Sequence, residues 1–136
     1  MKDYSDFRAD LEYGEEGEKI LDTILTHQKI EVKRDRMAHR TQNYFIEYQS
    51  HGKPSGINTT TAQHWALMTA DGSTTLLVQT TRLVEALQKF KADCIKGNIE
   101  PETTWAKQGG DGNTSIAFCI EAPALMGYLL ECCKDR

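Results

Sequence analysis

At 136 residues, the chain is long enough for one domain whose buried core needs neither a metal ion nor disulfide bonds to hold it together. With 39% hydrophobic and 26% charged residues and no apolar run of bilayer length, the composition disfavours a membrane protein and indicates a globular one. The N-terminal stretch is acidic and has no apolar segment of the secretory kind, so we expect a cytoplasmic protein. The formal net charge of −4 argues against a protein that coats nucleic acid.

The charges are unevenly distributed along the chain. Residues 1–28 carry three basic and eight acidic side chains, whereas residues 29–40 carry five basic and two acidic ones. A few carboxylates inside a basic segment suit a metal-dependent enzyme that acts on a polyanion, although a solvated hairpin rich in charge would give the same pattern.

The first predicted helix covers residues 15–26. Four apolar side chains fall at helical spacing and predict one buried stripe: Ile20, Leu21, Ile24 and Leu25. Glu18 lies at the flank of this stripe, where its carboxylate can either point over a site or favour the first turn of the helix.

Two strands are predicted next. Residues 29–35 alternate as in a half-buried strand, with Val32 on the apolar face and Lys33 and Asp35 on the polar face. Residues 43–50 are rich in aromatic and branched side chains and predict the second strand. We expect these two strands to pair as a hairpin.

The remaining elements alternate helices and strands behind a loop that is rich in glycine and proline. In chain order they are the loop at 51–58, a short helix at 61–68 with Trp65 in the core, a strand at 74–79, a helix at 81–95, a strand at 115–120 and a final helix from 124. The order αββαβαβα predicts a single α/β domain over residues 1–136, built as a mixed β-sheet flanked by helices.

The two predicted strands carry residues suited to phosphodiester hydrolysis. This reaction requires a polarised phosphoryl oxygen, an activated water molecule and neutralisation of the charge on the leaving oxygen. Asp35 and Glu47 can hold Mg²⁺, or Mn²⁺ in its place, because Mg²⁺ prefers oxygen ligands and keeps several waters. Lys33 faces the same side as Asp35 and can orient or deprotonate the attacking water. No organic cofactor is indicated.

These residues resemble the PD-(D/E)XK nuclease superfamily over about residues 15–80. The resemblance implies a restriction-endonuclease-like fold, in which a helix precedes a strand pair that carries an aspartate and then a Glu-x-Lys tripeptide. In the preferred alignment Asp35 is the aspartate, and the tripeptide begins at Glu47 and ends in glutamine, Gln49, in place of lysine. Glu18 then corresponds to the acidic residue that some members carry on the first helix.

The glutamine in place of the tripeptide's lysine can be interpreted in two ways. In the preferred alignment Lys33 supplies the amine from the neighbouring strand, and Gln49 can still orient the water. In the alternative alignment, Glu31 to Lys33 is itself the tripeptide, with Asp22 or an earlier acid as the aspartate. The alternative leaves too few residues for a strand pair before Glu31.

Residues 55–67 also look like the segment that follows the active strand in phage and bacterial nucleases of the Holliday-junction-resolvase and recombination type. The resemblance implies DNA contacts here, although ordinary helix capping would use the same residues. The predicted DNA-binding residues are Arg34, Arg36, Arg40, Lys53, Ser55, Thr60 and Gln63. Such enzymes commonly form homodimers. The apolar segment 124–130 is a candidate interface, but core packing is its preferred use.

We therefore expect an Mg²⁺-dependent endonuclease that hydrolyses DNA, selective for DNA structure in recombination or phage DNA metabolism, and encoded by a phage in a bacterial host. One alternative is a catalytically inactive module that keeps the fold and binds nucleic acid or protein, which Gln49 and the net acidity favour. Another is a small interaction protein whose hairpin charges are only solvated.

Overall fold

The structure is a computed structural model that describes residues 4–35, 43–98, 102–106 and 114–132. Its elements are α1 (Tyr4–His27), β1 (Ile30–Arg34), β2 (Asn43–Ser50), β3 (Lys53–Pro54), the 3-10 turn η1 (Gly56–Asn58), β4 (His64–Met68), β5 (Thr75–Gln79), α3 (Thr80–Lys96), β6 (Glu102–Ala106), β7 (Thr114–Glu121) and α4 (Ala122–Cys132). The mixed α/β class predicted from the sequence is confirmed.

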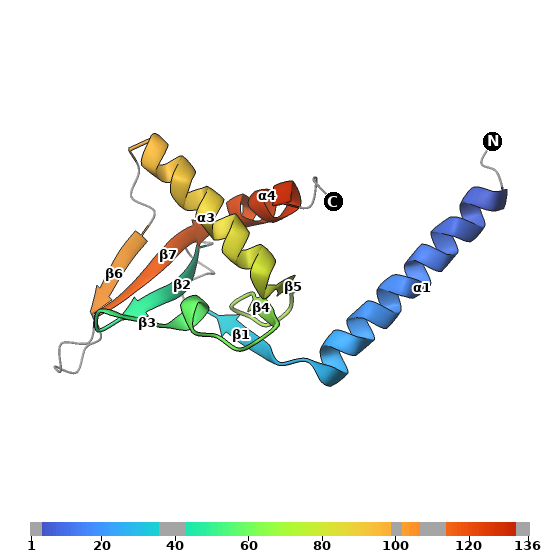
Figure 1. Ribbon diagram of the computed structural model, residues 1–136, viewed down its shortest axis with the longest axis horizontal. Coiled ribbons are helices and arrows are strands. Elements are labelled where there is room, and N and C mark those ends of the chain that lie inside the picture. Colours follow the sequence, from blue (N-terminus) through green and yellow to red (C-terminus); the bar gives the residue numbers. More distant parts are fainter. Residues whose placement is uncertain (1–3, 36–42, 99–101, 107–113, 133–136) are drawn as a thin grey trace.

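The strands form two sheets (Figure 1). A three-stranded sheet has the order β1-β4-β5, and a four-stranded antiparallel sheet has the order β3-β2-β7-β6. Helices α3 and α4 pack against both sheets, and the shared core contains the fully buried side chains Ile46, Leu67, Leu83, Leu87, Ile120 and Leu125. The predicted strands at 43–50, 74–79 and 115–120 and the predicted helix at 81–95 are confirmed.

The predicted helix at 61–68 is wrong, because β4 occupies most of this segment. Trp65, Ala66 and Leu67 are buried one after another, as in a strand that is covered on both faces. A short apolar run of this length fits a helix or a strand equally well by periodicity alone. The hydroxyl of Thr60, expected to cap the helix, instead accepts the backbone N–H of Ala62 at 3.2 Å in a local turn.

The predicted hairpin of residues 29–35 with 43–50 is also wrong. β1 pairs in parallel with β4, while β2 pairs with β7 and β3. The side chain of Gln63 favours this pairing, because its Oε1 accepts the backbone N–H of Lys29 at 2.8 Å just before β1. β1 is an edge strand, and Val32 is 57% exposed although it was expected on the buried face.

Helix α1 begins at Tyr4, well before the predicted start at residue 15, and projects away from the sheets (Figure 1). Its predicted buried stripe is wrong: Ile20, Leu21 and Leu25 are exposed, and only Ile24 is half-buried. Within the described residues, no helix is both long enough and apolar enough to cross a membrane.

Asp71 organises the turn between β4 and β5. Its Oδ1 accepts hydrogen bonds from the hydroxyl of Thr69 at 2.7 Å and from the backbone N–H and hydroxyl of Ser73 at 3.0 and 2.8 Å. These bonds favour the ionised carboxylate and lower the pKa of Asp71 from 3.8 to about 2.

Replacing Asp71 by asparagine should therefore destabilise the protein at pH 7 but much less near pH 2. The lowered pKa in the folded state stabilises the fold above the ordinary pKa of 3.8, and this contribution is lost as the pH falls towards 2. Urea unfolding of wild type and Asp71→Asn at both pH values measures the difference. An equal difference at pH 7 and pH 2 would contradict the assignment.

Candidate functional site

Asp35 directly follows β1, and both of its carboxylate oxygens have partners. Oδ1 lies 2.9 Å from Nζ of Lys33, and Oδ2 accepts the backbone N–H of Phe45 at 3.1 Å. The ion pair confirms that Lys33 and Asp35 face the same side, and their side chains are only 29% and 15% exposed. Because Phe45 belongs to β2, the second bond joins the end of the three-stranded sheet to the four-stranded one.

Glu47 lies two residues after Phe45, which corresponds to about 7 Å along the strand. Its Oε2 accepts the hydroxyl of Ser55 at 3.0 Å. Ile46, between the two, is fully buried in the core, so alternation directs Phe45 and Glu47 to the opposite face of β2. The carboxylate of Asp35 therefore binds the backbone of β2 two residues before Glu47, although the expected hairpin is absent.

The register between β2 and β7 shifts between Glu47 and Gln49, so Tyr48 forms a β-bulge. The carbonyl oxygen of Tyr48 accepts the backbone N–H of Ser55 at 2.9 Å and the side-chain amide of Asn58 at 3.1 Å. Bulges redirect neighbouring side chains and are frequent beside active sites. Because of the bulge, alternation along the strand does not determine whether the side chains of Gln49 and Glu47 share a face. Gln49 lies opposite Pro54 of β3.

Gly56 is a positioning residue that the sequence reasoning missed. Its φ is +52°, and a Cβ placed there would collide with the backbone carbonyl of Glu47. Only glycine allows the loop after β3 to lie this close to the strand that carries Glu47. The glycine and proline of this segment predicted a loop, but they gave no sign of which strand the loop contacts.

Replacing Gly56 by alanine is expected to destabilise the protein by about 2 kcal/mol or more, because the left-handed conformation and the collision with Glu47 act together. Gly52→Ala is the matched control: its φ is +73°, but a Cβ there meets nothing within 4 Å. The control should lose only about 1 kcal/mol. Equal losses in urea unfolding of the two variants would contradict the role of the close contact.

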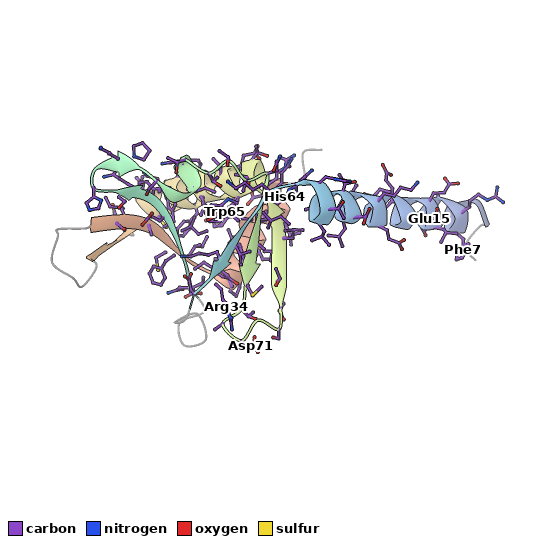
Figure 2. The ribbon with its side chains drawn as sticks, turned by 90° about the horizontal axis from the view of Figure 1, so that it is seen from below. Phe7, Glu15, Arg34, His64, Trp65 and Asp71 are labelled. Atoms are coloured by element: carbon purple, nitrogen blue, oxygen red, sulfur yellow. The ribbon has the colours of Figure 1, made fainter. Side chains whose placement is uncertain are left out.

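Some predicted DNA-binding residues are used within the fold. The guanidinium of Arg34 donates to the carbonyl of Ala70 from Nε at 2.9 Å and from Nη2 at 2.7 Å, which holds the turn that contains Asp71 (Figure 2). Gln63 and Thr60 bind backbone groups at the start of β1 and before β4. These three side chains therefore have a structural role here.

The other predicted DNA-binding residues are placed differently. Lys53 is exposed on β3, and Ser55 binds Glu47 at the candidate site. Arg36 and Arg40 lie outside the described residues. Lys53 and Ser55 therefore lie on or beside the loop that borders Glu47.

Glu18 is exposed on α1, in a surface depression lined by Glu15, Glu18, Lys19 and Asp22 of the same helix. Glu15 lies well out along the projecting helix, far from Arg34 at the end of β1 (Figure 2). The structure thus places Glu18 away from Asp35 and Glu47.

The donor set suits a cation that needs few protein ligands. No group of three or more His, Cys, Asp and Glu side chains suited to a metal ion occurs among the described residues. Mg²⁺ is commonly bound by one or two carboxylates together with water and substrate phosphates, so Asp35 and Glu47 are suitable in the type and number of ligands. The amine of Lys33 forms an ion pair with Asp35, and a bound cation would compete with this ion pair.

No protein-family model, curated protein or solved structure matches the chain.

Proposed function

We propose that the protein is an Mg²⁺-dependent nuclease that hydrolyses phosphodiester bonds in DNA, in the manner of the restriction-endonuclease-like enzymes. The observation that carries the proposal is the bond from the backbone N–H of Phe45 to Asp35, which brings a carboxylate and its lysine beside the strand that bears Glu47. Two carboxylates that hold a metal ion, together with an amine, can polarise the phosphate, activate water and neutralise the developing charge.

Each side chain has a separate role in this proposal. Asp35 and Glu47 would hold Mg²⁺, which when bound polarises the phosphate and increases the acidity of water. Lys33 can transfer its hydrogen bond from Asp35 to the attacking water or to a phosphate oxygen, where its charge opposes the growing negative charge. Gln49 can orient the water through its amide.

The basic segment supplies attraction for the DNA backbone. Residues 29–40 carry five basic and two acidic side chains, and Asp35 is one of the two acids. Phosphate contacts of this kind position a substrate without reading its sequence, so DNA binding should weaken steeply with added salt. The acidic stretch of residues 1–28 would be repelled by the same backbone.

The ion pair between Lys33 and Asp35 also favours a second candidate, a nucleic-acid-binding module without catalytic activity. At 2.9 Å the pair gives Lys33 and Asp35 a structural use that needs no metal ion, which an inactive module would keep. Gln49, in place of the lysine of the resembled tripeptide, points the same way.

One assay separates the candidates. Branched, single-stranded and duplex DNA are incubated with the protein in Mg²⁺, in Mn²⁺ or in EDTA, and both binding and cleavage are measured. Cleavage that requires Mg²⁺ or Mn²⁺ supports the nuclease. Binding without cleavage under any condition contradicts it and supports the module, and the absence of both contradicts both candidates.

A further inference from the structure

Helix α1 carries most of the exposed large apolar side chains of the described residues. Six of the ten belong to it: Phe7, Leu11, Tyr13, Ile20, Leu21 and Leu25. Scattered exposed apolar residues are ordinary, but a cluster on one element marks an interaction surface. The helix projects from the sheets, and Phe7 lies near its free end (Figure 2).

The side of α1 that approaches its own chain is a different one. An open cavity of about 520 Å³ lies between α1 and the ends of β4 and β5. Its lining residues are Glu16, Lys19, Ile20, Thr23, Ile24 and Gln28 of the helix, with His64 and Gln79 of the strands. At about 100° per residue, these helix positions lie on roughly the opposite side from Phe7, Leu11 and Glu18, and Leu21 lies at the border between the two sides. The rest of the described chain therefore cannot cover both sides of α1 at once.

The uncovered side has the spacing of a coiled-coil seam. Its positions alternate by four and three residues, and in order they are Phe7, Leu11, Gly14, Glu18, Leu21 and Leu25. This seam is symmetric about residue 16: apolar side chains occupy both ends, while Gly14 and Glu18 occupy the middle.

We propose that α1 pairs antiparallel with α1 of a second copy of the chain, through this seam. In that arrangement Phe7 faces Leu25 of the partner subunit, and Leu11 faces Leu21 of the partner subunit. A two-fold interface requires a surface that is complementary to itself, and the symmetric spacing provides one. Gly14 faces Glu18 of the partner subunit, and its missing side chain leaves room for that carboxylate to reach water.

The charges beside the seam favour the antiparallel direction. Arg8 would lie next to Asp22 of the partner subunit, and the two-fold axis makes this attractive contact twice, against a single repulsive contact of Glu15 with Glu15 of the partner subunit at the axis. Within one helix the same two residues are about 21 Å apart, so they cannot pair in a single chain. A parallel pair would instead place Asp10 next to Glu15 of the partner subunit, which is repulsive.

Pairing also accounts for the stability of a projecting helix. Helices that lack tertiary contacts are marginal in water, and Gly14 and Gly17 in the interior weaken α1 further. The contacts with the partner helix would supply the missing stabilisation. The inference concerns residues 7–25 alone and does not depend on the proposed nuclease chemistry.

Sedimentation equilibrium of the full chain tests the proposal. Wild type should be a dimer, and Leu21→Glu should weaken dimerisation at least a hundredfold. Glu12→Arg, an exposed position away from the seam, should leave it unchanged. Because α1 projects from the body, thermal unfolding of the body should be similar in all three proteins. A monomeric wild type, or a dimer that tolerates Leu21→Glu, would overturn the proposal.

A charge exchange tests the direction of the helices. Arg8→Glu and Asp22→Arg should each weaken dimerisation about tenfold, since each turns two exposed attractive contacts into repulsive ones. The double variant should return to near wild-type affinity. Glu18→Leu, which completes the apolar seam, should strengthen the dimer. Failure of the double variant to recover would rule out the antiparallel register.

Discussion

Replacing Asp35 by asparagine is expected to reduce the rate of Mg²⁺-dependent DNA cleavage by about 10²- to 10³-fold, because a charged ligand of the cation is lost. The amide oxygen of asparagine can still accept the backbone N–H of Phe45, so the connection between β1 and β2 should survive. The loss should therefore appear in the chemical step while the fold is retained.

Single-turnover cleavage with excess protein measures this effect without interference from product release. Glu85→Gln, an exposed carboxylate on α3, is the matched control and should cleave at the wild-type rate. DNA binding by Asp35→Asn should be retained, because the substitution removes a negative charge near the phosphates. Wild-type cleavage by Asp35→Asn would show that Asp35 holds no catalytic cation.

The second large effect concerns stability. Leu83 is fully buried on α3 within the core that joins both sheets, so Leu83→Ala should destabilise the protein by about 3 kcal/mol through lost burial and a residual cavity. For a chain of this size, the melting temperature should fall by roughly 10 °C.

Ile95→Ala provides the control on the same helix. Ile95 is 61% exposed, and its truncation should change the free energy of unfolding by no more than about 0.5 kcal/mol. Urea unfolding of both variants gives the comparison. A loss for Leu83→Ala as small as that for Ile95→Ala would contradict the assignment of α3 to the core.

The helices that were predicted correctly contain apolar residues at regular helical spacing within their own sequence. Leu83, Leu87 and Phe90 repeat at helical spacing through α3, and the final helix buries Leu125 and Leu129 as expected. The failures concern tertiary pairing. The sequence of β4 fits a helix or a strand equally well until its neighbours are known. β1 pairs with β4, which follows it by more than thirty residues, so no local pattern predicts this pairing.

The candidate site was likewise predictable only where its features depend on a single segment. The shared face of Lys33 and Asp35 follows from alternation within one strand, so it could be predicted. The backbone N–H of Phe45 and the contact of Gly56 with Glu47 could not, since both depend on how separate segments meet. Glu18 was misplaced because α1 was expected to pack on the sheet, whereas it projects into solvent.

Binding of Mn²⁺ tests the central claim most directly, because the proposed chemistry requires Asp35 and Glu47 to hold one cation. Electron paramagnetic resonance counts free Mn²⁺ during titration of the protein together with a non-cleavable DNA duplex. Wild type should bind one Mn²⁺ per chain, and Asp35→Asn and Glu47→Gln should each lose this binding. Equal Mn²⁺ binding by all three proteins, or none by wild type, would contradict the nuclease proposal.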